Sequence, residues 1–333
     1  MRAAFVETFG PPESLVTGEL PDPVAGPGEV LIEVAAAGVN FPDILVVAGT
    51  YQILPERPFS PGKEVAGTVR AVGNGVDRFA VGDRVLAQVE HGGYAELVAV
   101  PEPQVVALPD GVPFVDAAAF GLGAITAHFA LVRRANLQPG EIVLVTGAGG
   151  GVGSAAVQIA KALGASVIAA AQDEQRATLA KEQGADQVVL AGPSMRDDVM
   201  ALTDGRGVNV VLELVGGDVF AQSLRSTAWE GRLVVIGFAS GDLPSVKAGH
   251  ILVKNLAVLG LQVSDYRDRE PEAVRAAIEH MLQLYLEGRL TVPVARTFPL
   301  EEAGAALAAV QAGSVPGKVV LTCRPAADVT ALA

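Results

Sequence analysis

The stretch GEIVLVTGAGGGVGSAAVQIAK, residues 140–161, decides how the chain folds. It begins with the apolar run EIVLVT at 141–146, passes through a glycine-rich turn, and ends in a segment of small and apolar residues with helical character. A strand, a glycine turn and a helix in this order can hold a dinucleotide, because glycines let the backbone approach a diphosphate and a helix N-terminus offers unpaired N–H groups.

The spacing of the turn is Gly147-x-x-Gly150-x-x-Gly153 and not G-x-G-x-x-G, so the turn alone is a weak signal. A purely structural glycine turn is the alternative interpretation. The strand before it and the helix after it favour a nucleotide site. We therefore expect the diphosphate to be held by the residues of this turn, which are Gly147, Gly149, Gly150, Gly151, Val152 and Gly153.

Downstream of the turn, short apolar strands alternate with helical segments, a pattern that predicts a parallel sheet with crossover helices. Gly164 and Gly184 are expected to end the first two helices. The expected helices cover 152–164 and 173–184, and the expected strands after the first cover 166–171, 186–190, 208–214, 232–237 and 255–263.

The rest of the chain has a different pattern. From 28 to 107, short strands are broken by turns, which indicates a small β-rich unit. After 264 a helix at about 271–287, a strand at 290–298, a helix at 300–312 and a strand at 318–322 are expected to fold back onto that unit. We therefore predict an α/β protein with two domains, a β-rich domain of residues 1–122 and 265–333 and a nucleotide-binding domain of residues 123–264.

Composition excludes several classes of function. The chain has 24 Lys and Arg against 37 Asp and Glu, a net charge of −13, so we expect no nucleic-acid partner. A lone cysteine, Cys323, cannot form an internal disulfide or a multi-cysteine metal site, and it suits the cytoplasm. The N-terminus shows no signal-peptide pattern. The longest apolar stretch, 117–132, falls short of the roughly 20 residues of a membrane helix, so we expect a buried helix and no membrane partner.

The end of the second parallel strand bears on the choice of cofactor. In dinucleotide-binding βαβ units, an acidic residue there holds the ribose hydroxyls of NAD. This strand ends in alanines followed by Gln172, and the first carboxylate is Asp173. Arg176 could face a 2′-phosphate, which favours NADPH, or could simply be a solvated helix residue. We expect Gln172 and Arg176 to contact the cofactor.

The stretch 140–161 resembles the signature of quinone oxidoreductases, a branch of the medium-chain dehydrogenases/reductases. Residues 37–69 look like the N-terminal domain of the same family, and VGDRV at 81–85 and VPGKVVL at 315–321 add to the likeness. The resemblance implies a GroES-like catalytic domain, a Rossmann domain with a doubly wound parallel sheet, and an active site between them.

The zinc enzymes of this family differ at the ligand positions. By the same resemblance, the zinc ligands of those enzymes are a cysteine, a histidine and a second cysteine. At these positions this chain has Asn40, Lys63 and a residue near Leu122. The four-cysteine structural zinc loop has no counterpart, and the histidines do not form a cluster in the sequence. Asp43 and Glu64 could reach a site, but two carboxylates are a poor ligand set for zinc. We expect no metal site.

Three side chains of the β-rich domain are candidates for catalysis by resemblance. Asn40 is implied beside the nicotinamide, where its amide could donate to a carbonyl oxygen, or it is a turn residue that binds backbone. Tyr51 could donate a proton, or only line the cleft. Lys63 could attract an anionic acceptor, a CoA phosphate or the cofactor, or pair with Glu64 or Asp43.

Other cofactor contacts are also implied by resemblance alone. Thr126 resembles the residue that binds the nicotinamide carboxamide, although its hydroxyl could bond its own helix. Gly237 and Phe238 resemble the segment along the nicotinamide ribose, and Lys318 lies in the C-terminal motif. Many NADPH-dependent members carry a tyrosine near the position where this chain has Ala191. The expectation of NADPH therefore rests on the missing acid and on Arg176.

The resemblance implies an enzyme that transfers hydride from NADPH to quinones or other α,β-unsaturated carbonyls without zinc. A 2-enoyl thioester reductase is the enzymatic alternative, since both reactions reduce a conjugated carbonyl. A non-catalytic NADPH-binding protein with a structural or regulatory role is the alternative of another class. The apolar strand 255–263 comes last in the nucleotide domain, and as an edge strand it predicts a homodimer.

Overall fold

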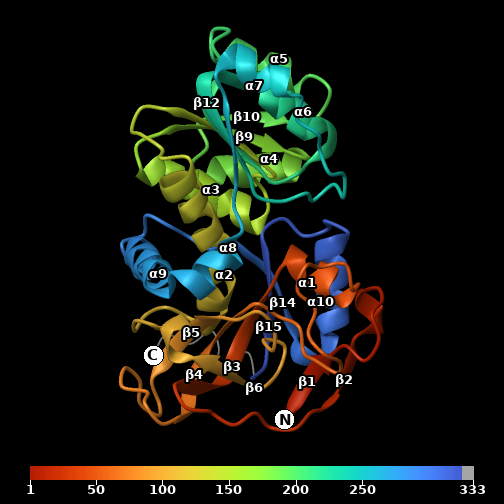
Figure 1. Ribbon diagram of the computed structural model, residues 1–333, viewed down its shortest axis with the longest axis vertical. Coiled ribbons are helices and arrows are strands. Elements are labelled where there is room, and N and C mark those ends of the chain that lie inside the picture. The colour runs from red at the N-terminus through yellow and green to blue at the C-terminus, as the bar shows by residue number, and fades with distance from the viewer. Residues whose placement is uncertain (325–333) are drawn as a thin grey trace. The chain divides into compact units, whose positions relative to one another are not determined.

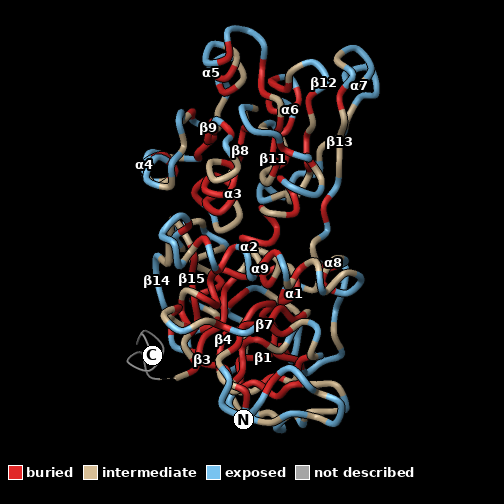
Figure 2. The backbone as a smooth tube through the Cα atoms, turned by 90° about the vertical axis from the view of Figure 1, so that its left-hand side faces the viewer, coloured by how far each residue is buried: buried red, intermediate tan, exposed pale blue. Residues whose placement is uncertain are grey.

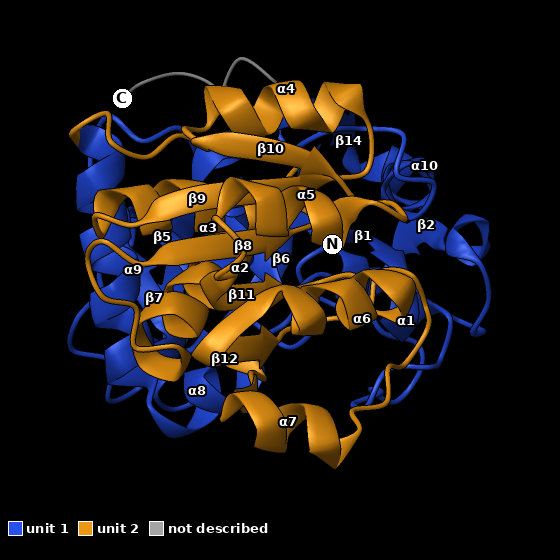
Figure 3. Cartoon of the chain, turned by 90° about the horizontal axis from the view of Figure 1, so that it is seen from above, with its two compact units in different colours: residues 1–122, 264–286, 292–333 blue, residues 123–263, 287–291 orange. Residues whose placement is uncertain are grey.

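The computed structural model describes residues 1–324 and divides them into two compact units, each described here by itself. Unit 1 contains Met1–Leu122, Ser264–Leu286 and the chain from Val292 onward, and unit 2 contains Gly123–Val263 with Glu287–Thr291 (Figure 3). The sequence had placed all of 265–333 in the β-rich domain, and 325–333 of that range lie outside the described residues.

The segment Glu287–Thr291 belongs to unit 2 because a helix of that unit binds it. The Gln158 side chain donates from Nε2 to the Thr291 carbonyl at 3.0 Å and accepts from the Thr291 N–H at 2.7 Å. Nothing in the local sequence of 287–291 signals this pairing with a residue 133 positions away.

Unit 1 is built on a seven-stranded sheet (Figure 1), in which β6 also pairs with β3. All its pairs are antiparallel except β14 with β15, and the first two strands form a separate hairpin that the sequence did not predict. The elements are β1 (Arg2–Phe5), β2 (Val16–Glu19), β3 (Glu29–Val39), α1 (Phe41–Val47), β4 (Glu64–Val72), β5 (Arg84–Gln88), β6 (Leu97–Pro101), β7 (Val105–Ala107), α2 (Phe114–His128), α8 (Val263–Arg269), α9 (Pro271–Leu286), β14 (Val294–Pro299), α10 (Ala303–Gln311) and β15 (Lys318–Thr322).

The register of three neighbouring strands positions the polar residues of unit 1. Val39 of β3 lies opposite Val319 of β15, and Ala37 of β3 lies opposite Val65 of β4. The end of β3 therefore lies between the start of β15 and the start of β4. Apolar side chains pack around these strands, and most of their residues are buried (Figure 2).

Unit 2 is a six-stranded sheet of parallel strands, which confirms the predicted Rossmann fold (Figure 3). The order β10-β9-β8-β11-β12-β13 corresponds to 3-2-1-4-5-6 in chain order, the doubly wound arrangement of dinucleotide-binding domains. The elements are β8 (Ile142–Thr146), α3 (Gly151–Ala162), β9 (Ser166–Ala171), α4 (Glu174–Glu182), β10 (Gln187–Leu190), α5 (Met195–Leu202), β11 (Val208–Glu213), α6 (Gly217–Ser226), β12 (Thr227–Val235), α7 (Ala248–Lys254) and β13 (Ala257–Gly260).

Helix α2 continues into a π-helix at Phe129–Arg134, where the Ala135 N–H bonds to the Ala130 carbonyl at 2.8 Å. Together they form a helical run of 21 residues that is long and apolar enough to cross a membrane, so the expectation that this stretch is too short was wrong. In its most apolar window 78% of the residues are buried inside the protein, as is typical of a core helix.

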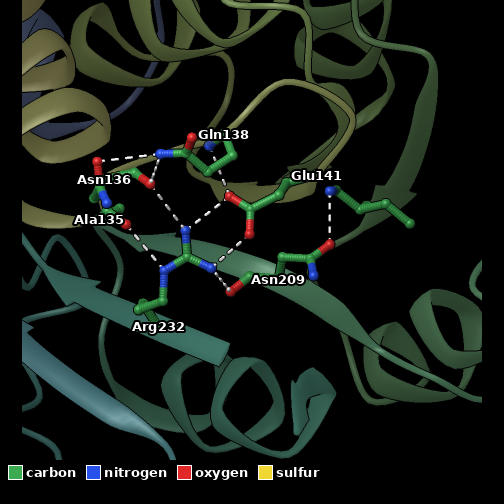
Figure 4. Close-up of polar contacts among 7 residues, drawn as sticks. Ala135, Asn136, Gln138, Glu141, Asn209 and Arg232 are labelled. Atoms are coloured by element: carbon green, nitrogen blue, oxygen red, sulfur yellow. Dashed lines mark hydrogen bonds and ion pairs between the residues drawn. The ribbon is translucent and has the colours of Figure 1, made fainter. Parts of the chain in front are cut away.

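An arginine clamp secures the start of β8, the strand that leads to the glycine turn (Figure 4). The Arg232 guanidinium donates to both Glu141 carboxylate oxygens at 2.7 Å and to the Ala135 carbonyl at 2.9 Å. The Gln138 N–H donates to the same carboxylate at 2.8 Å. The Arg232 hydrogen bond, above all, lowers the pKa of Glu141. Glu141 of the signature therefore has a structural role.

Replacing Glu141 by glutamine is expected to lower the free energy of unfolding by about 2 kcal/mol at pH 7, since a bidentate, charge-assisted pair is lost. Because the folded-state pKa is depressed, this stabilisation is present above the unfolded pKa of about 4.3 and disappears as the pH falls through the lower folded value. Urea unfolding at pH 7 and pH 3 measures the difference. The exposed pair Arg196–Asp197 supplies a control: Asp197→Asn should change stability by less than about 0.5 kcal/mol.

Candidate functional site

The glycine turn joins β8 to α3 and depends on two of its glycines. Gly147 has φ +61°, a left-handed conformation that glycine adopts without strain. Gly153 lies against the backbone of the turn itself, since a Cβ there would be 2.2 Å from the Gly147 oxygen and 2.6 Å from the Ala148 Cα. The turn therefore keeps its close geometry only with these residues.

The N-terminus of α3 has donors to offer a ligand. Gly150 is the N-cap, and the first i→i−4 bond of the helix runs from the Ser154 N–H to the Gly150 carbonyl at 2.9 Å. The N–H groups of Gly151, Val152 and Gly153 precede this bond and so have no acceptor within the helix. Together with the helix dipole, they form a cradle suited to a diphosphate.

The carboxyl ends of β8 and β11 meet beside this turn, where the strand order reverses. The buried Glu213 carboxylate accepts from the Thr146 hydroxyl at 3.2 Å and from the Gly216 N–H at 3.0 Å. Thr146 in turn accepts from the Leu214 N–H at 2.9 Å. Burial raises the pKa of Glu213. Sequence reasoning missed this pair, although an acid at the end of an apolar strand is a usable signal.

Arg176, in the first turn of α4 after β9, lies over the glycine turn. A Cβ at Gly149 would lie 2.4 Å from Arg176 Cγ, so the aliphatic stem of the arginine packs directly over that glycine. Asp173 caps α4, accepting from the Arg176 N–H at 2.9 Å, and its second oxygen is ion-paired with the Arg176 guanidinium. Mainly because of the backbone bond, the pKa of Asp173 is lowered. Gln172, beside it, is exposed.

The other predicted cofactor residues of unit 2 lie on separate elements. Gly237 and Phe238 follow β12, and the Gly237 N–H points to the Glu213 carbonyl at 3.4 Å. Gly216 passes close to the Phe238 ring, since a Cβ there would be 3.4 Å from Phe238 Cδ1. Thr126 lies in the part of α2 that belongs to unit 2 and is buried, with 6% of its surface exposed. Their contacts with a nucleotide stay predictions.

Unit 1 brings Asn40 and Lys318 together around a carboxylate that sequence reasoning did not place in the site. Lys318 Nζ lies 2.7 Å from both Asn40 Oδ1 and Glu64 Oε1, and Asn40 Nδ2 donates to Glu64 Oε1 at 2.8 Å. Asn40 Nδ2 also points to the Gly38 carbonyl at 3.3 Å. Both amide hydrogens of Asn40 are therefore engaged within the protein, and donation to a substrate would require one of these bonds to break.

Lys63 pairs with neither of its expected partners. Its buried ammonium forms an ion pair with Glu90 and also donates to the Glu90 carbonyl at 3.0 Å. Arg267 of α8 holds the second Glu90 oxygen at 3.0 Å. Glu90 follows β5 as Lys63 precedes β4, and these two strands are paired, so the sheet itself brings the two side chains together.

Tyr51 is half-buried, and Lys63 Nζ lies 4.5 Å from the centre of its ring, a cation–π contact. The ring packs against the apolar core of unit 1. Within residues 1–324 the structure records no hydrogen bond for the Tyr51 hydroxyl. The Tyr51 hydroxyl is therefore a donor that the described residues leave unused, whereas the Asn40 amide hydrogens are both engaged.

The buried Asp43 carboxylate holds the backbone at Asn40 in place. Asp43 Oδ2 accepts from the Asn40 N–H and from the Tyr94 hydroxyl, each at 2.9 Å. Both Asp43 and Tyr94 have no exposed surface. Burial raises the pKa of Asp43 to about 6 and that of Tyr94 well above its usual value. These bonds fix the start of α1, where Asn40 is the N-cap.

In the described part of the chain, no three His, Cys, Asp or Glu side chains are grouped so that they could hold a metal ion. The structure thus gathers two sets of predicted residues. Unit 2 contains the glycine turn with Gln172 and Arg176, and unit 1 contains Asn40, Tyr51, Lys63 and Lys318.

Comparisons with known proteins agree with this division. The alcohol dehydrogenase GroES-like domain matches residues 26–110, and the zinc-binding dehydrogenase domain matches residues 151–281. Quinone oxidoreductase-like protein 2 of Bos taurus is 39% identical over 325 residues, which cover 97% of this chain and 93% of that protein.

Two solved structures are similar over almost the whole chain. A mycobacterial protein complexed with NADPH has a TM-score of 0.92 and 34% identity, and the match covers 97% of this chain and 100% of that one. Escherichia coli quinone oxidoreductase complexed with NADPH has a TM-score of 0.90 and 30% identity, with the same two coverages of 97% and 100%.

Proposed function

Since the chain belongs to the quinone oxidoreductase family of medium-chain dehydrogenases/reductases, we propose that it reduces quinones or other α,β-unsaturated carbonyls with NADPH and without a catalytic metal. The glycine turn at 147–153 is the observation that carries this proposal. Its three N–H groups that have no acceptor within the helix, together with its close backbone, fit a diphosphate. When bound, NADPH supplies the hydride.

The preference for NADPH is supported by the state of Asp173. An NAD-type acid must accept hydrogen bonds from ribose hydroxyls, but both Asp173 oxygens already bind Arg176. The Arg176 guanidinium is anchored beside the glycine turn just after β9, where a 2′-phosphate would bind its N–H groups and share them with Asp173.

Replacing Arg176 by alanine is expected to weaken NADPH binding about tenfold, the loss of one charge-assisted contact to phosphate, and to leave NADH binding almost unchanged. Titration of both nucleotides by fluorescence measures this. Lys181→Ala, on the same helix, is the matched control for loss of one positive charge. An equal loss for both nucleotides in Arg176→Ala would contradict the 2′-phosphate role.

In this proposal, residues of unit 1 stabilise the charge that develops on the acceptor by hydrogen bonds, without a metal ion. The Tyr51 hydroxyl makes no recorded hydrogen bond within residues 1–324, so it would donate to the acceptor oxygen as negative charge develops there. The Lys63 ammonium at the ring face stabilises negative charge on that tyrosine.

Independence from zinc is supported by Lys63 as well. Its ammonium is 3% exposed and stands where, by resemblance, zinc enzymes have a histidine ligand. An ammonium has no lone pair with which to bind a metal ion. Activity that survives dialysis against a chelator is the expected result, and restoration of lost activity by added zinc would overturn this part of the proposal.

Reduction of a 2-enoyl thioester is the second candidate, because Tyr51 would serve the same chemistry. Lys63 was one reason to consider a CoA ester, but its ammonium is buried and paired with Glu90, so it is not accessible to a CoA phosphate. A parallel assay of benzoquinones and crotonyl-CoA with NADPH and NADH tests the proposal. Turnover of crotonyl-CoA without quinone turnover would reverse the order, and NADPH binding without any turnover would favour a non-catalytic role.

We also propose a homodimer formed through β13. Within the described residues this strand pairs only with β12, so its outer edge is open. The neighbouring helix α7 exposes Leu252 and Val253, at 77% and 74%. Sedimentation at micromolar concentration should give a dimer, and a monomer there would contradict the proposal.

A further inference from the structure

Glu64, the first residue of β4, binds three partners that are far apart in the sequence. One oxygen accepts from Asn40 Nδ2 at 2.8 Å and from Lys318 Nζ at 2.7 Å, and the other accepts from the Leu122 N–H at 2.6 Å. Glu64 is 1% exposed and Lys318 is 5% exposed. A carboxylate that is buried in this way is retained only with complete pairing, which these bonds provide.

The surrounding backbone leaves room for this carboxylate and for little else. A Cβ at Gly38 would lie 2.2 Å from Glu64 Oε1, and a Cβ at Gly121 would lie 3.0 Å from Glu64 Oε2. Gly38 is on β3 and Gly121 is on α2, so both neighbouring elements are shaped around Glu64.

The network also fixes which way the Asn40 amide points. Lys318 can only donate, so it requires Asn40 Oδ1, and the Glu64 carboxylate can only accept, so it requires Asn40 Nδ2. A flipped amide would turn its NH2 group toward the Lys318 ammonium and its oxygen toward the Glu64 carboxylate, and neither pair can form a hydrogen bond. Glu64 contributes to this orientation from both ends of the amide, because it binds the Asn40 nitrogen directly and also holds Lys318, which binds the Asn40 oxygen.

We propose that Glu64 is a positioning residue, which holds Asn40 and Lys318 in the geometry that cofactor binding and turnover require. This rests on the proposed function and on the expectation, from the resemblance, that those two residues lie beside the nicotinamide nucleotide. Glu64 acts through them and contacts neither cofactor nor acceptor.

Replacing Glu64 by methionine removes the acceptor at similar side-chain volume. It should lower kcat for quinone reduction about tenfold, because the amide loses its fixed orientation, with little change in the KM for quinone. Glu64→Gln keeps an oxygen for Asn40 and Lys318 but turns its NH2 group toward the Leu122 N–H, so it should recover part of the activity. Equal losses in the two variants would mean that only the charge matters, which contradicts positioning by hydrogen bonds.

A double-mutant cycle with Asn40→Ala separates positioning from a general structural role. In the Asn40→Ala background, Glu64→Met should lower kcat by less than about a further twofold, because no amide is left to orient. If the two effects multiply, Glu64 does not act through Asn40 and the proposal is wrong. Glu141→Gln, which breaks an ion pair in unit 2, is the control and should lower stability with kcat unchanged.

The Kd for NADPH is measured by fluorescence titration in the same set of proteins, which gives a second double-mutant cycle. If the wild-type protein binds NADPH but reduces no quinone, the proposed function fails, and non-additive Kd values still support the role of Glu64. If Glu64→Met does not fold, the cycle is run with Glu64→Ala, whose smaller side chain leaves room for water beside Asn40 and Lys318, and additivity again contradicts the proposal.

Discussion

Replacing Gly153 by alanine is expected to weaken NADPH binding at least about 100-fold, equivalent to the loss of two charge-assisted hydrogen bonds. The added Cβ would lie 2.2 Å from the Gly147 oxygen and 2.6 Å from the Ala148 Cα. Both are backbone atoms that no rotamer change can move away, so the turn must open. The N–H groups of the α3 N-terminus would then no longer converge on one diphosphate.

Fluorescence titration with NADPH gives the affinity, and circular dichroism reports whether the protein remains folded. Gly192→Ala is the matched control, since a Cβ at Gly192 meets nothing within 4 Å in the same unit. A folded Gly153→Ala protein that binds NADPH as tightly as the wild type would show that the turn does not hold the nucleotide.

Replacing Tyr51 by phenylalanine is expected to lower kcat for quinone reduction about 100-fold and to leave the Kd for NADPH unchanged, because only a hydroxyl is removed. The hydroxyl has no recorded hydrogen bond in the described chain, and the ring keeps its packing and its contact with Lys63. The loss therefore reports chemistry and not a collapsed site.

Steady-state kinetics at saturating NADPH measures the effect. Tyr285→Phe is the control, because it removes a tyrosine hydroxyl that binds Asp116 within the same unit and should leave kcat unchanged. Wild-type turnover in Tyr51→Phe would assign Tyr51 to the wall of the cleft, and the proton would then have to come from elsewhere.

The sequence was sufficient to predict what depends on local pattern. The glycine turn follows a strand and precedes a helix, and the apolar strands assemble into a parallel sheet, because periodicity and glycine conformations are local properties. The hairpin of β1 and β2 was missed because both strands are short and the residues of β2 are mostly exposed.

The partners of the charged residues could not be predicted, because they depend on the register of distant strands. Lys63 was expected to bind Glu64 or Asp43, which lie close to it in the sequence, yet its partner is Glu90, 27 positions away. Lys318 meets Glu64 across 254 positions. Such contacts follow from the order β15-β3-β4-β5 in the sheet, which no single segment encodes.

The most direct test of the account is a crystal structure of the protein with NADPH. The account predicts the diphosphate within hydrogen-bond distance of the N–H groups of Gly151, Val152 and Gly153, with the 2′-phosphate at Arg176. NADPH bound elsewhere, with those N–H groups facing only solvent, would contradict it.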